Sequence, residues 1–110
     1  MRLAPMIASF VQSASGDVVA NRVRIVPDDV AFSYGAAFDE VPAPVPSGDG
    51  RSRIDLAQLP TAQSLDGTFD VYITARDARG NESDPLLIDD ASFDFSAPEA
   101  PTDAQIDPAA

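Results

Sequence analysis

The sequence predicts an all-β fold, an antiparallel sandwich of about seven strands. Residues 69–76 alternate strictly, and the apolar side chains of one strand face are Phe69, Val71, Ile73 and Ala75. Clusters of Asp, Gly, Ser and Pro separate this stretch from other short apolar runs, as turns separate strands. The length of 110 residues allows one domain with one core.

Two strands are predicted in the first part of the chain. Residues 5–12 form the first strand, and a turn rich in Ser and Gly follows it. Residues 18–26 form the second strand, in which Arg22 and Arg24 lie opposite a face of valine and isoleucine. Pro27 ends this strand because proline cannot donate to a strand ladder.

The predicted third strand is the most aromatic one. It covers residues 30–39, and we expect it in the core because Phe32, Tyr34 and Phe38 share one face. The next segment, Val41–Pro46, has proline at alternate positions, which favours an extended connection that protects a sheet edge. As an alternative, such a segment is a ligand for proline-recognising domains.

Two further strands complete the predicted sandwich. Residues 51–57 form a strand with Ile54 and Leu56 on one face. Residues 86–95 form the last strand, and its acidic pair Asp89–Asp90 predicts a bulge or a break.

The C-terminal residues have a different composition. Residues 97–110 are rich in Pro, Ala and acidic residues, and Ile106 is their one large apolar residue. Such a segment buries too little apolar surface to order itself. We therefore divide the chain into a sandwich domain, residues 1–96, and an acidic tail, residues 97–110.

The alternating strand and the loop after it also resemble a known pattern. The run Leu-x-x-Thr-aromatic, followed by Ala-x-Asp-x-x-Gly-Asn-x-Ser, is similar to the penultimate strand and loop of fibronectin type III modules and bacterial Ig-like domains. The matching residues are Leu65, Thr68, Phe69, Ala75, Asp77, Gly80, Asn81 and Ser83. The resemblance implies an Ig-like or fibronectin type III-like sandwich. Phe69 stands where the family has its corner tyrosine, and the family's core tryptophan is absent.

The charge of the chain argues against some classes of partner. Its net charge is −11, from 18 acidic residues and seven arginines. Such a surface repels phosphate backbones and anionic lipids, so we expect neither nucleic acid nor membrane insertion. No apolar stretch is long enough for a transmembrane helix.

The chain contains neither Cys nor His. It therefore lacks a thiol nucleophile, the usual general base and the commonest metal ligand. We expect a protein that is not an enzyme and that has no cofactor, with calcium as the one ion to consider.

Four residues after the alternating strand are calcium candidates: Asp77, Asn81, Glu82 and Asp84. The resemblance implies the same role, because similar loops lie near calcium in some bacterial Ig-like adhesin repeats. The alternative is turn chemistry, in which Asp77 and Asn81 bond to the backbone and Gly80 takes a positive φ.

Five residues are candidates for protein contacts: Tyr72, Arg76, Arg22, Arg24 and Ile106. The first four lie on strand faces that we predict to be outward, and Tyr and Arg are enriched at interfaces. They are also ordinary surface residues, so the alternative is that they have no special role.

These observations lead to a non-catalytic structural or interaction module. The N-terminal run Leu3–Val11 is short and interrupted by proline, so we expect no signal peptide. A small sandwich that begins with Met and ends in its own tail resembles accessory proteins of phage-like particles, such as head decorations or tail components. This predicts neighbouring subunits as partners and a location on the particle surface. The alternative is an adhesion or spacer module of a secreted or surface protein, with an extracellular location.

Overall fold

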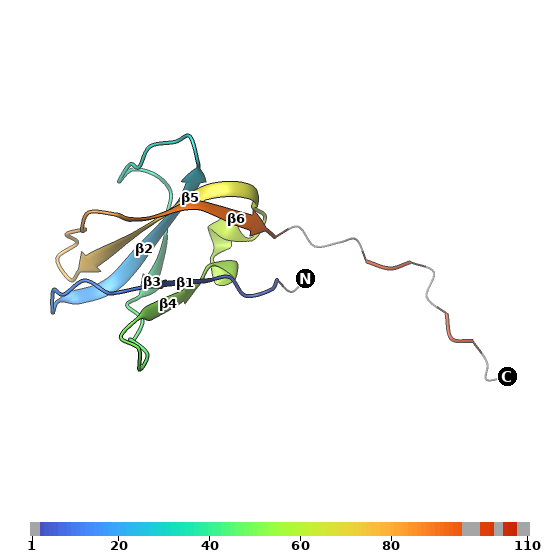
Figure 1. Ribbon diagram of the computed structural model, residues 1–110, viewed down its shortest axis with the longest axis horizontal. Helices are drawn as coiled ribbons and strands as arrows, with labels where there is room; N and C mark the ends of the chain where they lie inside the picture. The colour runs from blue at the N-terminus through green and yellow to red at the C-terminus, as the bar shows by residue number, and fades with distance from the viewer. Residues whose placement is uncertain (1–2, 96–99, 103–104, 108–110) are drawn as a thin grey trace.

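The computed structural model describes residues 3–95, 100–102 and 105–107. Its strands form two antiparallel sheets that enclose a core (Figure 1). The strands are β1 (Ile7–Phe10), β2 (Val18–Pro27), β3 (Asp39–Pro42), β4 (Ser52–Asp55), β5 (Asp66–Asp77) and β6 (Leu86–Asp94). The predicted all-β sandwich is confirmed, with six strands in the described residues where about seven were expected.

The larger sheet has the strand order β3-β2-β5-β6, and the smaller sheet pairs β1 with β4. The long antiparallel pair of β2 and β5 lies at the centre of the larger sheet, and Val23 is opposite Ile73 in its register. The predicted alternation of β5 is confirmed on its apolar face, where Val71, Ile73 and Ala75 are buried. The core is thus built on the strand with the clearest sequence signal.

The core lies between the two sheets. The smaller sheet contributes Ala8, Phe10 and Ile54, and the larger sheet contributes Val23 and Val71 among others. At one end of the sandwich, the rings of Phe93 and Phe95 meet edge to face with centroids 5.5 Å apart. These aromatic contacts attach the end of β6 to the core.

Two short 3₁₀ helices, η1 (Leu56–Gln58) and η2 (Pro60–Ala62), follow β4. The Asp55 side chain caps η1 by accepting a hydrogen bond from the Ala57 amide. Leu56, Leu59 and Ala62 are buried in the core. The strand predicted over residues 51–57 therefore ends early, at Asp55, and the chain between β4 and β5 adds to the core through these helices.

The prediction of a third strand over residues 30–39 is wrong. The structure has a loop over residues 28–38, and β3 begins only at Asp39. One turn is closed by the bond from the Val30 amide to the Pro27 carbonyl, and a second by the bond from the Ala36 amide to the Ser33 carbonyl. These turns interrupt any ladder, although the aromatic spacing imitates the period of a strand.

The predicted bulge at Asp89–Asp90 is confirmed. The register of β5 with β6 shifts between Phe69 and Val71, so the two acids of β6 lie opposite Asp70. Asp90 has a φ of 53°, and its amide donates to Asp70 Oδ1 at 3.1 Å. The extra residue thus turns the acidic pair toward Asp70.

Each sheet ends in strands that have one partner only. Among the described strands, β1 pairs with β4 alone, and β3 and β6 each pair with a single neighbour. A sheet of two strands leaves part of a four-stranded sheet uncovered on both sides, since strands lie about 4.8 Å apart. No helix in this part of the chain is long and apolar enough to cross a membrane.

Candidate functional site

Four of the five predicted contact residues come together on the outer face of the larger sheet. Arg22 bonds to Glu40 and Glu82 at 3.0 and 2.9 Å, and Arg76 bonds to Glu40 at 2.6 Å. Arg24 Nη1 lies 2.5 Å from Glu82 Oε2. We call these three arginines and two glutamates the arginine network. Tyr72 lies beside it, with its ring centroid 5.0 Å from that of Phe32.

Arg24 lies on the outer face of the sheet as predicted, but it is not exposed there, because its side chain is fully buried. The loop of residues 28–38 covers it, and the guanidinium lies 4.8 Å from the Phe38 ring centroid and 5.4 Å from that of Phe32. Nη2 also donates to the Tyr34 carbonyl at 3.0 Å. The predicted core aromatics therefore pack on a buried cation instead of the central core.

Glu82 compensates the buried charge of Arg24. Burial raises the pKa of the Glu82 carboxyl, but hydrogen bonds from Arg24, Thr74 and Arg22 outweigh burial and lower the pKa overall. Thr74 donates to Glu82 Oε2 at 2.5 Å. Glu82 thus stays ionised under the loop and joins β2, β5 and the loop after β5.

The charged groups of the arginine network bond to one another inside the chain. Hydrogen bonds from Arg76 and Arg22 also lower the pKa of the Glu40 carboxyl. Arg24 Nε is the one buried side-chain nitrogen without a partner among the described residues. The network therefore holds the loop on the sheet. The surface that it presents consists of loop side chains such as Tyr34 and Phe38, which are 49% and 39% exposed.

The acids among the four calcium candidates, Asp77, Glu82 and Asp84, do not form a group of three carboxylates within 4.8 Å of one another. Asp77 Oδ1 accepts from the amides of Arg79 and Asn81, and Oδ2 accepts from the Asn81 side chain. These hydrogen bonds lower the pKa of the Asp77 carboxyl, and the bond from the Asn81 side chain has the largest effect. Gly80 has a φ of 91°, and Glu82 belongs to the arginine network. The hydrogen bonds of this loop are those of turn chemistry.

A different acidic group forms at the β6 bulge. Carboxylate oxygens of Asp70, Asp89 and Asp90 lie within 4.8 Å of one another, and Asp70 is buried. The hydrogen bond between Asp89 and Asp70, with the charge of Asp90, raises the pKa of Asp89. Asp70 lies opposite the apolar face in the alternation of residues 69–76, and the sequence alone did not connect it with Asp89 and Asp90. Only the bulge prediction pointed toward them.

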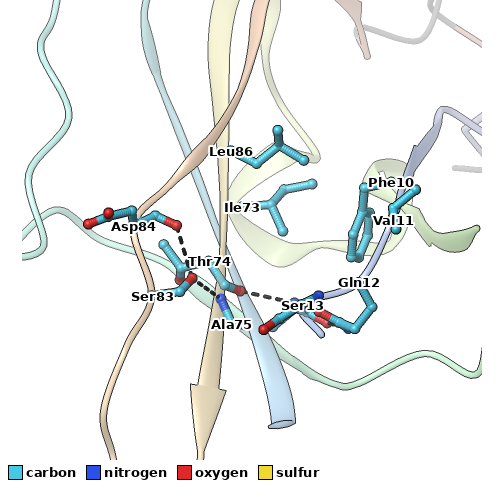
Figure 2. Close-up of a pocket in the computed structure, with 11 residues that line it drawn as sticks. Phe10, Val11, Gln12, Ser13, Ile73, Thr74, Ala75, Ser83, Asp84 and Leu86 are labelled. Atoms are coloured by element: carbon cyan, nitrogen blue, oxygen red, sulfur yellow. Dashed lines mark hydrogen bonds between the residues drawn. The ribbon is translucent and has the colours of Figure 1, made fainter. Parts of the chain in front are cut away.

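An open groove of about 230 Å³ lies between the two sheets on the β1 side. Figure 2 shows the Ile73 and Leu86 side chains directed toward the chain segment that carries Phe10 and Val11. Val11 is 69% exposed and Leu86 is 48% exposed. The groove combines these apolar side chains with polar ones, among them Gln12 and Asp84, and it lies at the C-terminal end of β1. The sequence did not predict this groove, because the pattern of a single strand does not reveal how far one sheet extends past the other.

A second groove, of about 420 Å³, lies on the opposite flank between β3 and β4. Its lining is more charged and includes Asp39, Glu40, Arg53 and Asp55. The remaining predicted contact residue, Ile106, lies in the C-terminal segment and is 99% exposed. In Figure 1 the described parts of this segment lie away from both sheets.

The fold and these surfaces define an all-β sandwich with one covered face and two open flanks. No protein-family profile, no curated protein and no solved structure matches the chain.

Proposed function

We propose that this chain is a non-catalytic structural subunit, an Ig-like module of a phage-like particle that serves as head decoration or tail component. One observation supports this most directly: the exposed side chains of Val11 and Leu86 line a groove on the side of the sandwich where β1 and β6 end their sheets. Exposed apolar side chains beside free strand edges favour contacts with other protein segments. The partners are neighbouring subunits on the particle surface.

The covered face of the larger sheet supports a structural role as well. The arginine network fixes β2, β3, β5 and the loop of residues 78–85 to one another, and Arg24 also bonds to the loop of residues 28–38. A cross-linked face of this kind keeps its shape when neighbours press on it. The net charge of −11 adds repulsion from nucleic acid, so the contacts that we propose are with proteins.

The alternative is an adhesion or spacer module of a secreted or surface protein. The observation that favours it is the C-terminal segment, whose described residues lie away from the sandwich in the manner of a linker between modules (Figure 1). In that setting the grooves contact adjacent modules of the same chain.

The two settings differ in where the protein is found. Lysates, cell-surface fractions and culture medium of the source cells are separated on density gradients, and the chain is detected with an antibody. The proposal predicts that the chain sediments with dense particles that also contain DNA. Detection only in the surface fraction or the medium would overturn it and favour the adhesion or spacer module.

A further inference from the structure

The groove of Figure 2 has an exposed carboxylate at its rim that the chain itself does not pair. Asp84 lines the groove, and its backbone carbonyl accepts from the Ser83 hydroxyl at 2.9 Å. No ion pair in the described part of the chain includes its carboxylate. Figure 2 shows this carboxylate directed away from the side chains of Phe10 and Gln12. A cation at the rim would therefore meet an unpaired negative charge.

A second hollow, of about 190 Å³, adjoins the groove on its polar side. The two hollows have three lining residues in common: Ser13, Ala75 and Ser83. In the second hollow, Asp77 and Glu82 bond inside the chain. Asp17 also lines it, is exposed, and belongs to no ion pair among the described residues. The joined surface thus has unpaired carboxylates at two places.

The groove offers apolar surface beside these charges. Its apolar lining includes the exposed side chains of Val11 and Leu86 and the buried Ile73. Its volume of about 230 Å³ is smaller than the pockets of roughly 300–1,000 Å³ that hold drug-sized ligands, so it suits single side chains of a protein segment. A long basic side chain packs its methylene stem on apolar surface and keeps its charged head at the wet rim.

The opposite groove, between β3 and β4, differs because its charged side chains have partners inside the chain. Glu40 belongs to the arginine network, and Arg53 is paired with Asp49. Asp55 caps η1, and the Asp39 carboxylate accepts from an amide of η2 at 3.3 Å. Charge complementarity therefore favours the groove of Figure 2 as the place where a cationic partner binds.

We propose that the groove of Figure 2 and the hollow beside it bind an extended basic segment of a neighbouring protein, with a Lys or Arg side chain at Asp84 and an apolar side chain on Leu86. The proposal rests on the function proposed above and specifies the neighbour as a protein of different sequence. The chain has no lysine and a net charge of −11, so a second copy is a poor source of free cations. Four of its arginines are already in ion pairs: Arg22, Arg24, Arg53 and Arg76.

Three synthetic peptides of nine residues with blocked ends are the probes. One alternates Lys with Val, the second alternates Glu with Val, and the third alternates Lys with Ser. Backbone NMR spectra of the full chain follow each titration. We expect the Lys–Val peptide to shift the signals of Val11, Thr74 and Leu86, and the Glu–Val peptide to leave them unchanged. The Lys–Ser peptide should bind about tenfold more weakly, because it lacks the apolar contact.

Variants of the chain separate the charge from the apolar contact. Asp84→Asn keeps the size of the side chain and should weaken Lys–Val binding about two- to fivefold, as expected for an exposed ion pair. Leu86→Ala should weaken binding of the Lys–Val peptide more than that of the Lys–Ser peptide, and Val11→Ala repeats this test in case Leu86→Ala disturbs β6. Asp28→Asn is the matched control, because it removes an exposed carboxylate that lines neither hollow.

Four results would overturn the proposal. The first is a wild type that shows no shifts at millimolar Lys–Val peptide, and the second is a set of shifts centred outside the two hollows. The third is equal binding of the Lys–Val and Lys–Ser peptides, which would mean attraction by net charge alone. The fourth is an Asp84→Asn variant that binds like the wild type. Particle association in the gradient experiment does not depend on these results, so either proposal can fail alone.

Discussion

Arg24 has a fully buried charge, and Glu82 is the carboxylate that compensates it at 2.5 Å. A buried cation that loses its counter-charge destabilises a fold strongly, whereas an apolar replacement of similar size costs much less. Glu82 also retains Arg22 and Thr74 as partners when Arg24 is absent. The two residues of this pair are therefore unequal in their effect on stability.

We predict that Glu82→Ala lowers the free energy of unfolding by about 3–5 kcal/mol, because Arg24 is left buried without a carboxylate. Arg24→Met should cost clearly less, since its side chain packs against Phe32 and Phe38 while Glu82 keeps two donors. Urea unfolding of both variants measures the difference. Equal losses would contradict the unequal roles of the two residues.

Asp89 and Glu82 make stability depend on pH in opposite directions. The pKa of Glu82 is lowered from 4.5, so its contribution is complete above that value and is lost as the pH falls through the lower folded pKa. The pKa of Asp89 is raised from 3.8, so its contribution is complete below that value and is lost as the pH rises through the higher folded pKa.

Asp89→Asn should therefore stabilise the protein at neutral pH, because it removes a charge held beside Asp70 and Asp90. The gain should disappear below pH 3.8, where the wild-type carboxyl is protonated in both states. Asp17→Asn, in the exposed turn before β2, is the matched control. Urea unfolding at neutral pH and below pH 3.8 measures the gain in stability. A gain that persists at the lower pH would contradict the account.

At the scale of elements, the β6 bulge depends on the backbone of one residue. Asp90 has a φ of 53°, a region that Asp tolerates and that β-branched residues avoid. Asp90→Val should thus be less stable than Asp90→Gly by about 1–2 kcal/mol. Thermal unfolding compares the two variants, both of which remove the carboxylate. Equal midpoints would mean that the bulge does not need this conformation.

Strand periodicity predicted some elements well and one element wrongly. β2, β5 and β6 were found from alternation and turn residues, because one face of each packs on the core. Residues 30–39 have the same aromatic alternation, but their rings cover Arg24 on the outer face. Periodicity shows that the side chains of one face pack against something. It does not show whether they pack against the apolar core or against a buried charge.

The candidate site was only partly predicted, because strand periodicity has the same limit there. Tyr72, Arg76, Arg22 and Arg24 were grouped as outward strand residues, and the structure does place them on one sheet face. The burial of Arg24 under residues 28–38 depends on long-range contacts that a period of two cannot reveal. The same limit applies to the groove of Figure 2, which is formed by the different widths of two sheets.

At the scale of the whole molecule, the chain has one cross-linked face and one uncharged strand edge. The arginine network ties the strands of the first together, and the second belongs to β1, which pairs with β4 alone among the described strands. A chain with a net charge of −11 repels its own copies at long range, so contacts between copies need such an uncharged edge. These features support the proposal of an assembling subunit over that of a spacer.

The most direct test of this account is light scattering of the purified chain combined with backbone NMR relaxation. The account predicts a mass above that of one chain at high concentration, with the Ile106 amide as restricted as the amides of β5. A mass of one chain at every concentration, with residues 105–107 moving on the fast timescale, would contradict it and favour a spacer module.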